Sequence, residues 1–224
     1  MNYAFDFSVL TGENLDLLWH GIQITTWLTL VGAVGGGALG IFCAWSRSLG
    51  PRWLRPPVVA YIELTRNTPF LIQLFFIFFG LPVLGVKLTG MQASLLAMVV
   101  NLGAYSAEII RAGIEATPRG QFEAGASLAM SRMQVFRHVV LMPALQRIWP
   151  ALSSQVVIVM LGSAVCSQVA AQDLTYAANL IQARTFRAFE AYFATTLIYL
   201  MLAILLRQAL RALGWALFAR RSPA

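Results

Sequence analysis

Thr117–Pro143, TPRGQFEAGASLAMSRMQVFRHVVLMP, is the longest polar-rich stretch between apolar segments that are long enough to span a bilayer. Its apolar and small residues recur at alternating steps of four and three on one helical face: Phe122, Ala126, Ala129, Met133, Phe136 and Val140. At its centre, small residues surround the carboxylate of Glu123. Small residues let another surface approach the backbone, and an exposed carboxylate suits a basic partner. We therefore expect a helical segment that another protein contacts, or else an ordinary surface helix in a polar loop.

The composition is typical of an integral membrane protein, since 58% of the 224 residues are hydrophobic and only 11% are charged. A soluble domain would have roughly twice that charged fraction. Five apolar segments approach or exceed the ~20 residues that a helix needs to cross the hydrocarbon. They cover about 17–45, 57–84, 88–110, 148–171 and 191–213. Because backbone groups in lipid must be satisfied internally, we predict an all-α membrane protein with five transmembrane helices in one domain over 1–224.

The basic residues predict the orientation, because Lys and Arg are enriched in cytoplasmic loops. Most arginines fall in the first loop, the central loop at about 111–147 and the C-terminal tail: Arg47, Arg52, Arg55, Arg111, Arg119, Arg132, Arg137, Arg147, Arg207, Arg211, Arg220 and Arg221. The opposite side has only Lys87, Arg184 and Arg187. We therefore expect the N terminus outside and the C terminus inside. Topology then explains the net charge of +7, and we expect the lipid bilayer rather than nucleic acid as a partner.

The second apolar segment holds Glu63 and Arg66 three residues apart on one helical face. Ionisable groups at membrane depth are costly and are usually paired or functional. The two residues either form an ion pair that positions the helix, or they take part in a pathway or gate. Pro69 removes a backbone donor, and we expect Asn67 and Thr68 to satisfy the groups that it frees.

The third segment carries a polar stripe, because Asn101, Tyr105 and Glu108 recur at steps of four and three. Such a stripe should face the bundle interior or a water-filled path. Glu108 alternatively forms a structural clamp with Arg111 or Arg66.

Small residues mark the first segment, and polar residues interrupt the fourth. Gly32, Gly36 and Gly40 lie at four-residue spacing, which predicts a smooth strip for a close helix crossing. Ser163 and Gln168 are among the polar residues of the fourth segment.

Three blocks of the chain resemble the polar amino acid branch of ABC-importer permeases. The first block has the Glu-x-x-Arg-Asn/Gly-Thr-Pro pattern followed by Gln-Leu, at Glu63, Arg66, Asn67, Thr68, Pro69, Gln73 and Leu74. The second block matches at Asn101, Ala104, Tyr105, Ala107, Glu108, Arg111, Ala112 and Gly113. The third block is Arg184–Glu190, and Asp173-Leu174-Thr175 also matches the branch.

The stretch Thr117–Pro143 resembles the EAA loop of these permeases. The family pattern is Glu-Ala-Ala, three residues, Gly, and further on an aliphatic pair, Leu and Pro. The corresponding residues here are Glu123, Ala124, Gly125, Ala129 in place of the Gly, Val139, Val140, Leu141, and Met142 in place of the Pro, which follows one late as Pro143. In the fourth segment Leu161–Val165 replaces the usual Lys-Asp/Asn-Thr/Ser-Ser-Leu, so the Lys and its acidic or amide neighbour are missing.

This resemblance implies a type I ABC importer permease that works by alternating access in the bacterial inner membrane. The implied partners are ABC ATPase subunits, a second permease subunit (identical or sister) and a periplasmic amino acid-binding protein that docks on Arg184–Glu190. The implied ATPase-coupling residues are Arg119, Gly120, Gln121, Glu123, Ala124, Gly125 and Ala129. The candidate substrate-pathway or gating residues are Glu63, Arg66, Asn67, Thr68, Gln73, Asn101, Tyr105, Glu108, Ser163 and Gln168.

No catalytic or metal-binding constellation is evident in the sequence. His20 and His138 fall on opposite sides of the predicted membrane, and Lys87 follows Val86, which excludes a Gly-Lys-Ser/Thr phosphate loop. We expect ATP and Mg²⁺ to bind a separate ATPase. A secondary transporter would typically show internal repeats, which are absent, and a purely structural membrane subunit is the other alternative. The solute could be an amino acid, an opine or another amino-acid-like molecule.

Overall fold

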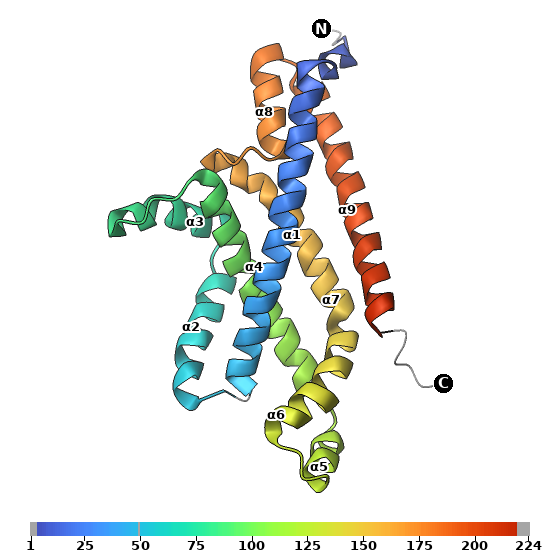
Figure 1. The fold of residues 1–224 in the computed structure, drawn as a ribbon. Coiled ribbons are helices and arrows are strands. Elements are labelled where there is room, and N and C mark those ends of the chain that lie inside the picture. Colours follow the sequence, from blue (N-terminus) through green and yellow to red (C-terminus); the bar gives the residue numbers. More distant parts are fainter. Residues whose placement is uncertain (1–3, 49, 219–224) are drawn as a thin grey trace. The chain divides into compact units, whose positions relative to one another are not determined.

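The computed structural model describes residues 4–48 and 50–218, except for the side chains at positions 119, 132, 133, 136 and 140. Within these residues the structure contains helices and turns and no strand, which confirms the all-α prediction (Figure 1). The helices are α1 (Glu13–Ser48), α2 (Arg55–Arg66), α3 (Phe70–Phe75), α4 (Gly90–Glu115), α5 (Arg119–Ser127), α6 (Arg132–Val135), α7 (Leu141–Gly162), α8 (Leu174–Thr185) and α9 (Ala188–Phe218).

Among residues 4–48 and 50–218, four helical stretches are long and apolar enough to cross a membrane. They are Glu13–Ser48, Gly90–Glu115, Leu141–Val169 and Ala188–Phe218. The pair Arg52–Arg66 and Phe70–Leu84 adds a fifth span if its two parts count as one. The predicted apolar segments thus lie on helices, and α8 is an additional short helix that the sequence did not suggest.

The second apolar segment is two helices rather than one. α2 ends at Arg66, and α3 begins only after Pro69, which lacks a backbone N–H and disfavours helical geometry in the residue before it. The Asn67 side chain donates to the Glu63 carbonyl at 2.8 Å, and the Thr68 hydroxyl donates to the Leu64 carbonyl at 2.8 Å. These bonds confirm that the two residues satisfy the backbone groups at the break.

The chain divides into two compact units. The first comprises Met1–Gly32, Phe70–Met98 and Val157–Leu206, and the second comprises Ala33–Pro69, Val99–Val156 and Arg207–Ala224. The core of the first unit is a cluster of buried apolar residues: Leu18, Leu174, Ala177, Ile181 and Ala191. Gly21 permits a close approach here, because a Cβ at this position would lie 2.7 Å from the Leu174 Cα. The start of α8 therefore packs tightly against α1.

The second unit has two core clusters and a close crossing of α1 and α4. One cluster includes Ala44, Ile110, Ile114, Val135, Ala144 and Ile148, and the other includes Cys43, Val58, Ile62 and Ala107. A Cβ added at Gly36 would lie 2.7 Å from the Leu102 Cβ, and one added at Gly40 would lie 2.5 Å from the Ser106 Cβ. The predicted glycine strip is therefore confirmed as a surface where another helix approaches closely.

Candidate functional site

The most concentrated group of charges in the second unit surrounds Glu108 on α4. Its carboxylate pairs with Arg47, with Arg66 at 3.7 Å and with Arg111 at 2.9 Å. Arg111 also pairs with Glu115 at 2.5 Å. Three guanidinium groups thus meet two carboxylates, which leaves an excess of one positive charge. The Glu108 side chain is only 16% exposed, so the surrounding cations offset much of the cost of removing it from water.

Local structure brings these groups together. Arg66 is the last residue of α2, and its guanidinium lies 5.6 Å from the centre of the Tyr105 ring, a cation–π distance. Tyr61 fixes α2 against α4, because its hydroxyl donates to the Val100 carbonyl at 2.6 Å. The structure pairs Arg66 with Glu108 rather than with Glu63, whose carboxylate accepts a hydrogen bond from Asn67 at 3.1 Å. The described residues thus contain no Glu63–Arg66 ion pair, and Glu108 pairs with both of its candidate partners, Arg66 and Arg111. The role of these residues as a clamp, a pathway or a gate stays a prediction.

The other predicted pathway residues divide between the two units. The second unit holds Glu63, Arg66, Asn67, Thr68, Asn101, Tyr105 and Glu108, and the first holds Gln73, Ser163 and Gln168. Ser163 is buried, and its hydroxyl donates to the Met160 carbonyl at 2.7 Å, a bond local to its own helix end. Gln168 is exposed. The structure thus brings Arg66, Tyr105 and Glu108 into one site, whereas the Ser163 hydroxyl bonds to a carbonyl of its own helical stretch.

Two members of the charge cluster were not among the predicted site residues. Arg47 was assigned to membrane topology alone, and Glu115 was not singled out. Glu115 could have been found from its spacing, because it lies four residues after Arg111 on one helix. Nothing local marks Arg47, which is 61 residues from Glu108 in the chain.

The predicted coupling segment is two helices joined by a tight turn. α5 ends in a Schellman motif, in which the Met130 N–H donates to the Gly125 carbonyl and the Ala129 N–H donates to the Ala126 carbonyl. Ala129 has φ of 54°, the left-handed region that favours glycine. The family pattern places its glycine at this position. The prediction of one continuous helical face from Phe122 to Val140 is therefore wrong.

The next helix begins with a capping box. The Ser131 N–H donates to the Gln134 side chain at 2.8 Å, and the Gln134 N–H donates to the Ser131 hydroxyl at 3.3 Å. α6 continues through a π-helical turn at Phe136–Val140 into α7. A π turn holds more residues than an α turn, and this one directly precedes the stretch in which Pro143 comes one residue later than in the family pattern.

The predicted coupling residues have different surroundings. Gly120, Gln121, Glu123, Ala124 and Ala129 are exposed. Gly125 is buried, and a Cβ added to it would lie 2.6 Å from the Val135 Cγ2, so this glycine serves the packing of α5 on its own segment. Arg119 begins α5, but its side chain lies outside the described residues.

Both ends of the coupling segment are fixed to the long helices. The Arg147 guanidinium of α7 donates to the Ala116 carbonyl, just after α4, at 2.7 Å. Gly113 allows Ile148 to pack closely, since an added Cβ would lie 2.5 Å from the Ile148 Cγ2. The segment that contains α5 thus begins and ends where α4 and α7 are held together.

The first unit contains a second carboxylate that is shielded from water. Asp173 is fully buried and caps α8, where it accepts a hydrogen bond from the Tyr176 N–H at 2.9 Å. The Tyr199 hydroxyl donates to it at 3.1 Å. Burial raises the pKa of the Asp173 carboxyl to about 6. In the part of the chain that the structure describes, no cation lies within ion-pair distance of it.

Solved structures share this fold. A chain in the crystal structure of an amino acid ABC transporter with histidines has a TM-score of 0.85 and 32% identity, covering 95% of this chain and 99% of that chain. A chain of the inward-facing MetNI methionine ABC transporter has a TM-score of 0.78 at 20% identity, covering 92% and 99% of the two chains. The second likeness concerns the fold alone.

Sequence relatives cover nearly the whole chain. The glutamine transport system permease protein GlnP of Escherichia coli K12 is 31% identical over 211 residues, 93% of this chain and 96% of the relative. The probable glutamine ABC transporter permease protein GlnM of Bacillus subtilis is 33% identical over 192 residues, 86% and 89% of the two chains. The model of the binding-protein-dependent transport system inner membrane components matches residues 36–215. The chain therefore belongs to this family and is a multi-pass inner-membrane protein.

Proposed function

We propose that this chain is a permease subunit that imports a polar amino acid by alternating access, driven by ATP hydrolysis on another subunit. The observation that carries the proposal is the exposed Glu123 on a segment whose ends are fixed to α4 and α7. A partner that moves α5 can thereby reorient membrane helices. The likeness to two glutamine permeases, at 31% and 33% identity, supports an amino acid as the solute.

The proposal includes three kinds of partner. An ABC ATPase pair binds ATP and Mg²⁺ and contacts Glu123 and the exposed residues around it, with the C terminus inside and the N terminus outside. A second permease subunit, identical or sister, completes the pathway. A periplasmic amino acid-binding protein docks on the loop around Phe186, whose side chain is 84% exposed.

The Glu108 cluster is the candidate site for the solute's carboxylate. Its excess positive charge suits an anionic group, and Arg66 is the most exposed of the three arginines, at 40% of its side chain. Gln73, Asn101 and Gln168 are candidates for the remaining polar contacts along the pathway. The absent Lys and acidic or amide pair near Ser163 favours a solute that these groups do not need to recognise, or a sister subunit that supplies them.

Purification from the native membrane in mild detergent tests the assembly. We expect a P-loop ATPase and a second permease among the co-purifying chains, identified by mass. Reconstitution of this complex should give ATP-dependent uptake of a polar amino acid in the presence of the binding protein. Recovery of the chain without an ATPase at every detergent strength would overturn the proposal.

A matched pair of variants tests the carboxylate site. Arg66→Gln should raise the KM for uptake about tenfold, the effect of losing roughly 1.4 kcal/mol of binding to a charged group. Arg52→Gln removes an exposed arginine outside the cluster and should leave the KM unchanged. An equal KM in both variants would show that Arg66 does not contact the solute.

A further inference from the structure

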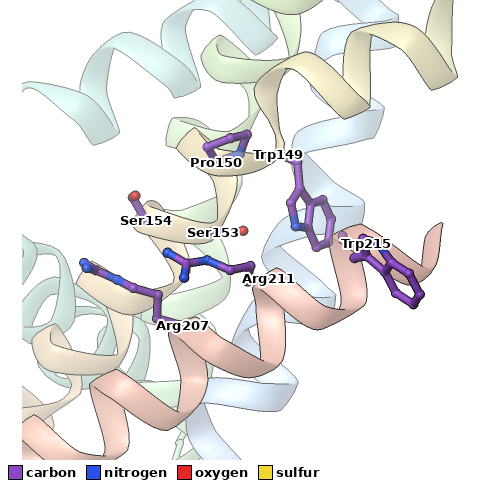
Figure 2. A pocket seen from close by; sticks show the side chains of 8 residues that line it. Trp149, Pro150, Ser153, Ser154, Arg207, Arg211 and Trp215 are labelled. Carbon is purple, nitrogen blue, oxygen red and sulfur yellow. The ribbon is translucent and has the colours of Figure 1, made fainter. Parts of the chain in front are cut away.

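A pocket of about 380 Å³ lies between α7 and α9 in the second unit, away from the Glu108 residues (Figure 2). Its volume falls in the ~300–1,000 Å³ range of small-molecule sites. Three pairs of residues account for most of its wall: Ser153 and Ser154, Arg207 and Arg211, and Trp149 and Trp215. The pocket therefore combines hydroxyl donors, cations and aromatic rings.

Close packing builds this pocket. The Trp149 indole N–H donates to the Leu210 carbonyl of α9 at 2.9 Å, and its ring meets Phe218 edge-on at 5.6 Å. Gly214 makes room for the indole, because an added Cβ would lie 2.3 Å from the Trp149 Nε1. The wall of the pocket is thus fixed by a hydrogen bond across the two helices.

Three polar side chains of the pocket, those of Ser153, Arg207 and Arg211, lack partners within the described residues. Arg207 and Arg211 lie one helical turn apart, and neither forms an ion pair or hydrogen bond there. The Ser153 Oγ is buried and has no hydrogen-bond partner in the same part of the chain. Buried hydroxyls are nearly always hydrogen-bonded, so an unpaired one beside two guanidinium groups points to an anion with several oxygen acceptors. Figure 2 shows both arginines reaching from α9 toward the α7 segment with the serines.

The surroundings of the pocket are apolar. Trp215 is 75% exposed, and Leu213 and Leu217 are also exposed on the same helix. Tryptophan rings favour the headgroup level of a bilayer, and aliphatic side chains on a spanning helix face acyl chains. An occupant with an anionic head and an apolar body fits both features.

Charge complementarity favours a lipid over a second copy of this chain. The second unit has four acidic residues, and two of them, Glu108 and Glu115, are already paired with arginines. A membrane with anionic phospholipids instead offers phosphate groups at high local concentration, and basic pockets between membrane helices are where such headgroups bind.

We propose that this pocket binds the phosphate headgroup of an anionic phospholipid. Arg207 and Arg211 pair with the phosphate oxygens, and the Ser153 hydroxyl donates a third hydrogen bond. Trp215 packs against the glycerol and the first part of an acyl chain. This inference rests on the membrane location of the chain and not on the identity of the transported solute.

Native mass spectrometry of the detergent-purified complex tests the proposal. Cardiolipin, phosphatidylglycerol and phosphatidylcholine are added separately at graded concentrations, and the bound lipid is counted. The double variant Arg207→Gln/Arg211→Gln should bind the anionic lipids roughly 25-fold more weakly, about fivefold for each arginine near the membrane surface. Phosphatidylcholine should bind weakly to both proteins.

Two further variants separate the pocket from general charge and folding effects. Arg52→Gln/Arg55→Gln also removes two exposed arginines from one end of a helix and should retain the lipid. Ser153→Ala removes the unpaired hydroxyl, so it should leave the melting temperature in lipid-free detergent unchanged while weakening lipid binding about tenfold.

Three results would overturn the proposal. The first is equal retention of anionic lipid by the wild type and all variants. The second is binding of millimolar inorganic phosphate in the pocket with no preference of the protein for a diacyl lipid over phosphate. This result would identify a soluble anion as the occupant. The third is cross-linking of the Trp215→Cys variant to the second permease, together with no quenching of the wild-type tryptophan fluorescence by brominated lipid, which would identify a protein surface.

Discussion

Glu108 in the second unit and Asp173 in the first are both acidic residues shielded from solvent, and the protein stabilises them in different ways. Glu108 has three guanidinium partners, those of Arg47, Arg66 and Arg111. Asp173 accepts hydrogen bonds from neutral donors, the Tyr176 N–H and the Tyr199 hydroxyl, and no cation of the described residues lies within ion-pair distance of it. An apolar protein can therefore hold a shielded carboxylate either by surrounding it with cations or by giving it neutral hydrogen-bond donors, and in the second case burial still raises its pKa. The first solution fixes three helices to one point, and the second caps one short helix.

The largest expected effect comes from removing the Glu108 charge. Glu108→Gln leaves three guanidinium groups without their shared carboxylate, and we expect a loss of about 3–5 kcal/mol in the free energy of unfolding. Thermal denaturation in detergent measures it. Glu115→Gln is the matched control, because Glu115 is 62% exposed and has one arginine partner, and should cost less than about 1 kcal/mol. Similar melting temperatures for the two variants would mean that the cluster is not what anchors these helices.

The sequence predicted part of this contrast. The stripe on α4 indicated Glu108, and one of the two alternatives for this residue was a clamp with Arg111 or Arg66; the structure pairs it with both. The contribution of Arg47 depends on how α1 crosses α4, and single-sequence periodicity carries no information about pairing between distant helices. The glycine strip predicted a crossing but not which residues would meet across it.

The breaks in the helices were predictable only where the residue type marks them. Pro69 predicted the end of α2, because proline lacks the backbone N–H that would donate a helical hydrogen bond. The residue type of Ala129 does not predict the end of α5, because alanine favours helices and the apolar spacing continues across this position. The Schellman turn there is imposed by the contact of Gly125 with Val135 and by the capping box that follows. Tertiary packing therefore sets the backbone conformation at Ala129, against the helix propensity of alanine.

The second largest effect is a pH dependence that Asp173 alone should confer. Its folded pKa of about 6 lies above the ordinary 3.8, so the folded protein binds this proton more tightly than the unfolded chain does. The contribution of Asp173 to the free energy of unfolding should therefore fall as pH rises from about 4 to about 6, by about 3 kcal/mol in total, and stay constant above. Asp173→Asn cannot ionise, so its melting temperature minus that of the wild type should increase across this window. A constant difference between the two proteins would show that Asp173 is ionised throughout.

A smaller effect separates the capping role of Asp173 from its ionisation. Asparagine is as good an N-cap as aspartate, whereas alanine has no acceptor for the Tyr176 N–H. Asp173→Ala should therefore be less stable than Asp173→Asn by about 1 kcal/mol at every pH. Hydrogen exchange of the first turn of α8 provides the local measurement. Equal protection in the two variants would argue that packing at Gly21, and not the cap, orders this helix.

A third carboxylate, that of Glu123, completes the comparison because it is exposed. Surface substitutions of this kind usually change stability by less than about 0.5 kcal/mol, so Glu123→Lys should insert and melt like the wild type. Its effect should be on coupling, since a basic partner that meets a carboxylate would be repelled by lysine. Substrate-stimulated ATP hydrolysis in reconstituted vesicles should fall to the unstimulated level, while Gln146→Lys, another exposed position, should keep the stimulation. Unchanged stimulation of ATP hydrolysis in Glu123→Lys would contradict a coupling role for Glu123. The three carboxylates would then differ only in how they contribute to stability, and the site of contact with the ATPase would have to be sought elsewhere on the segment between α4 and α7.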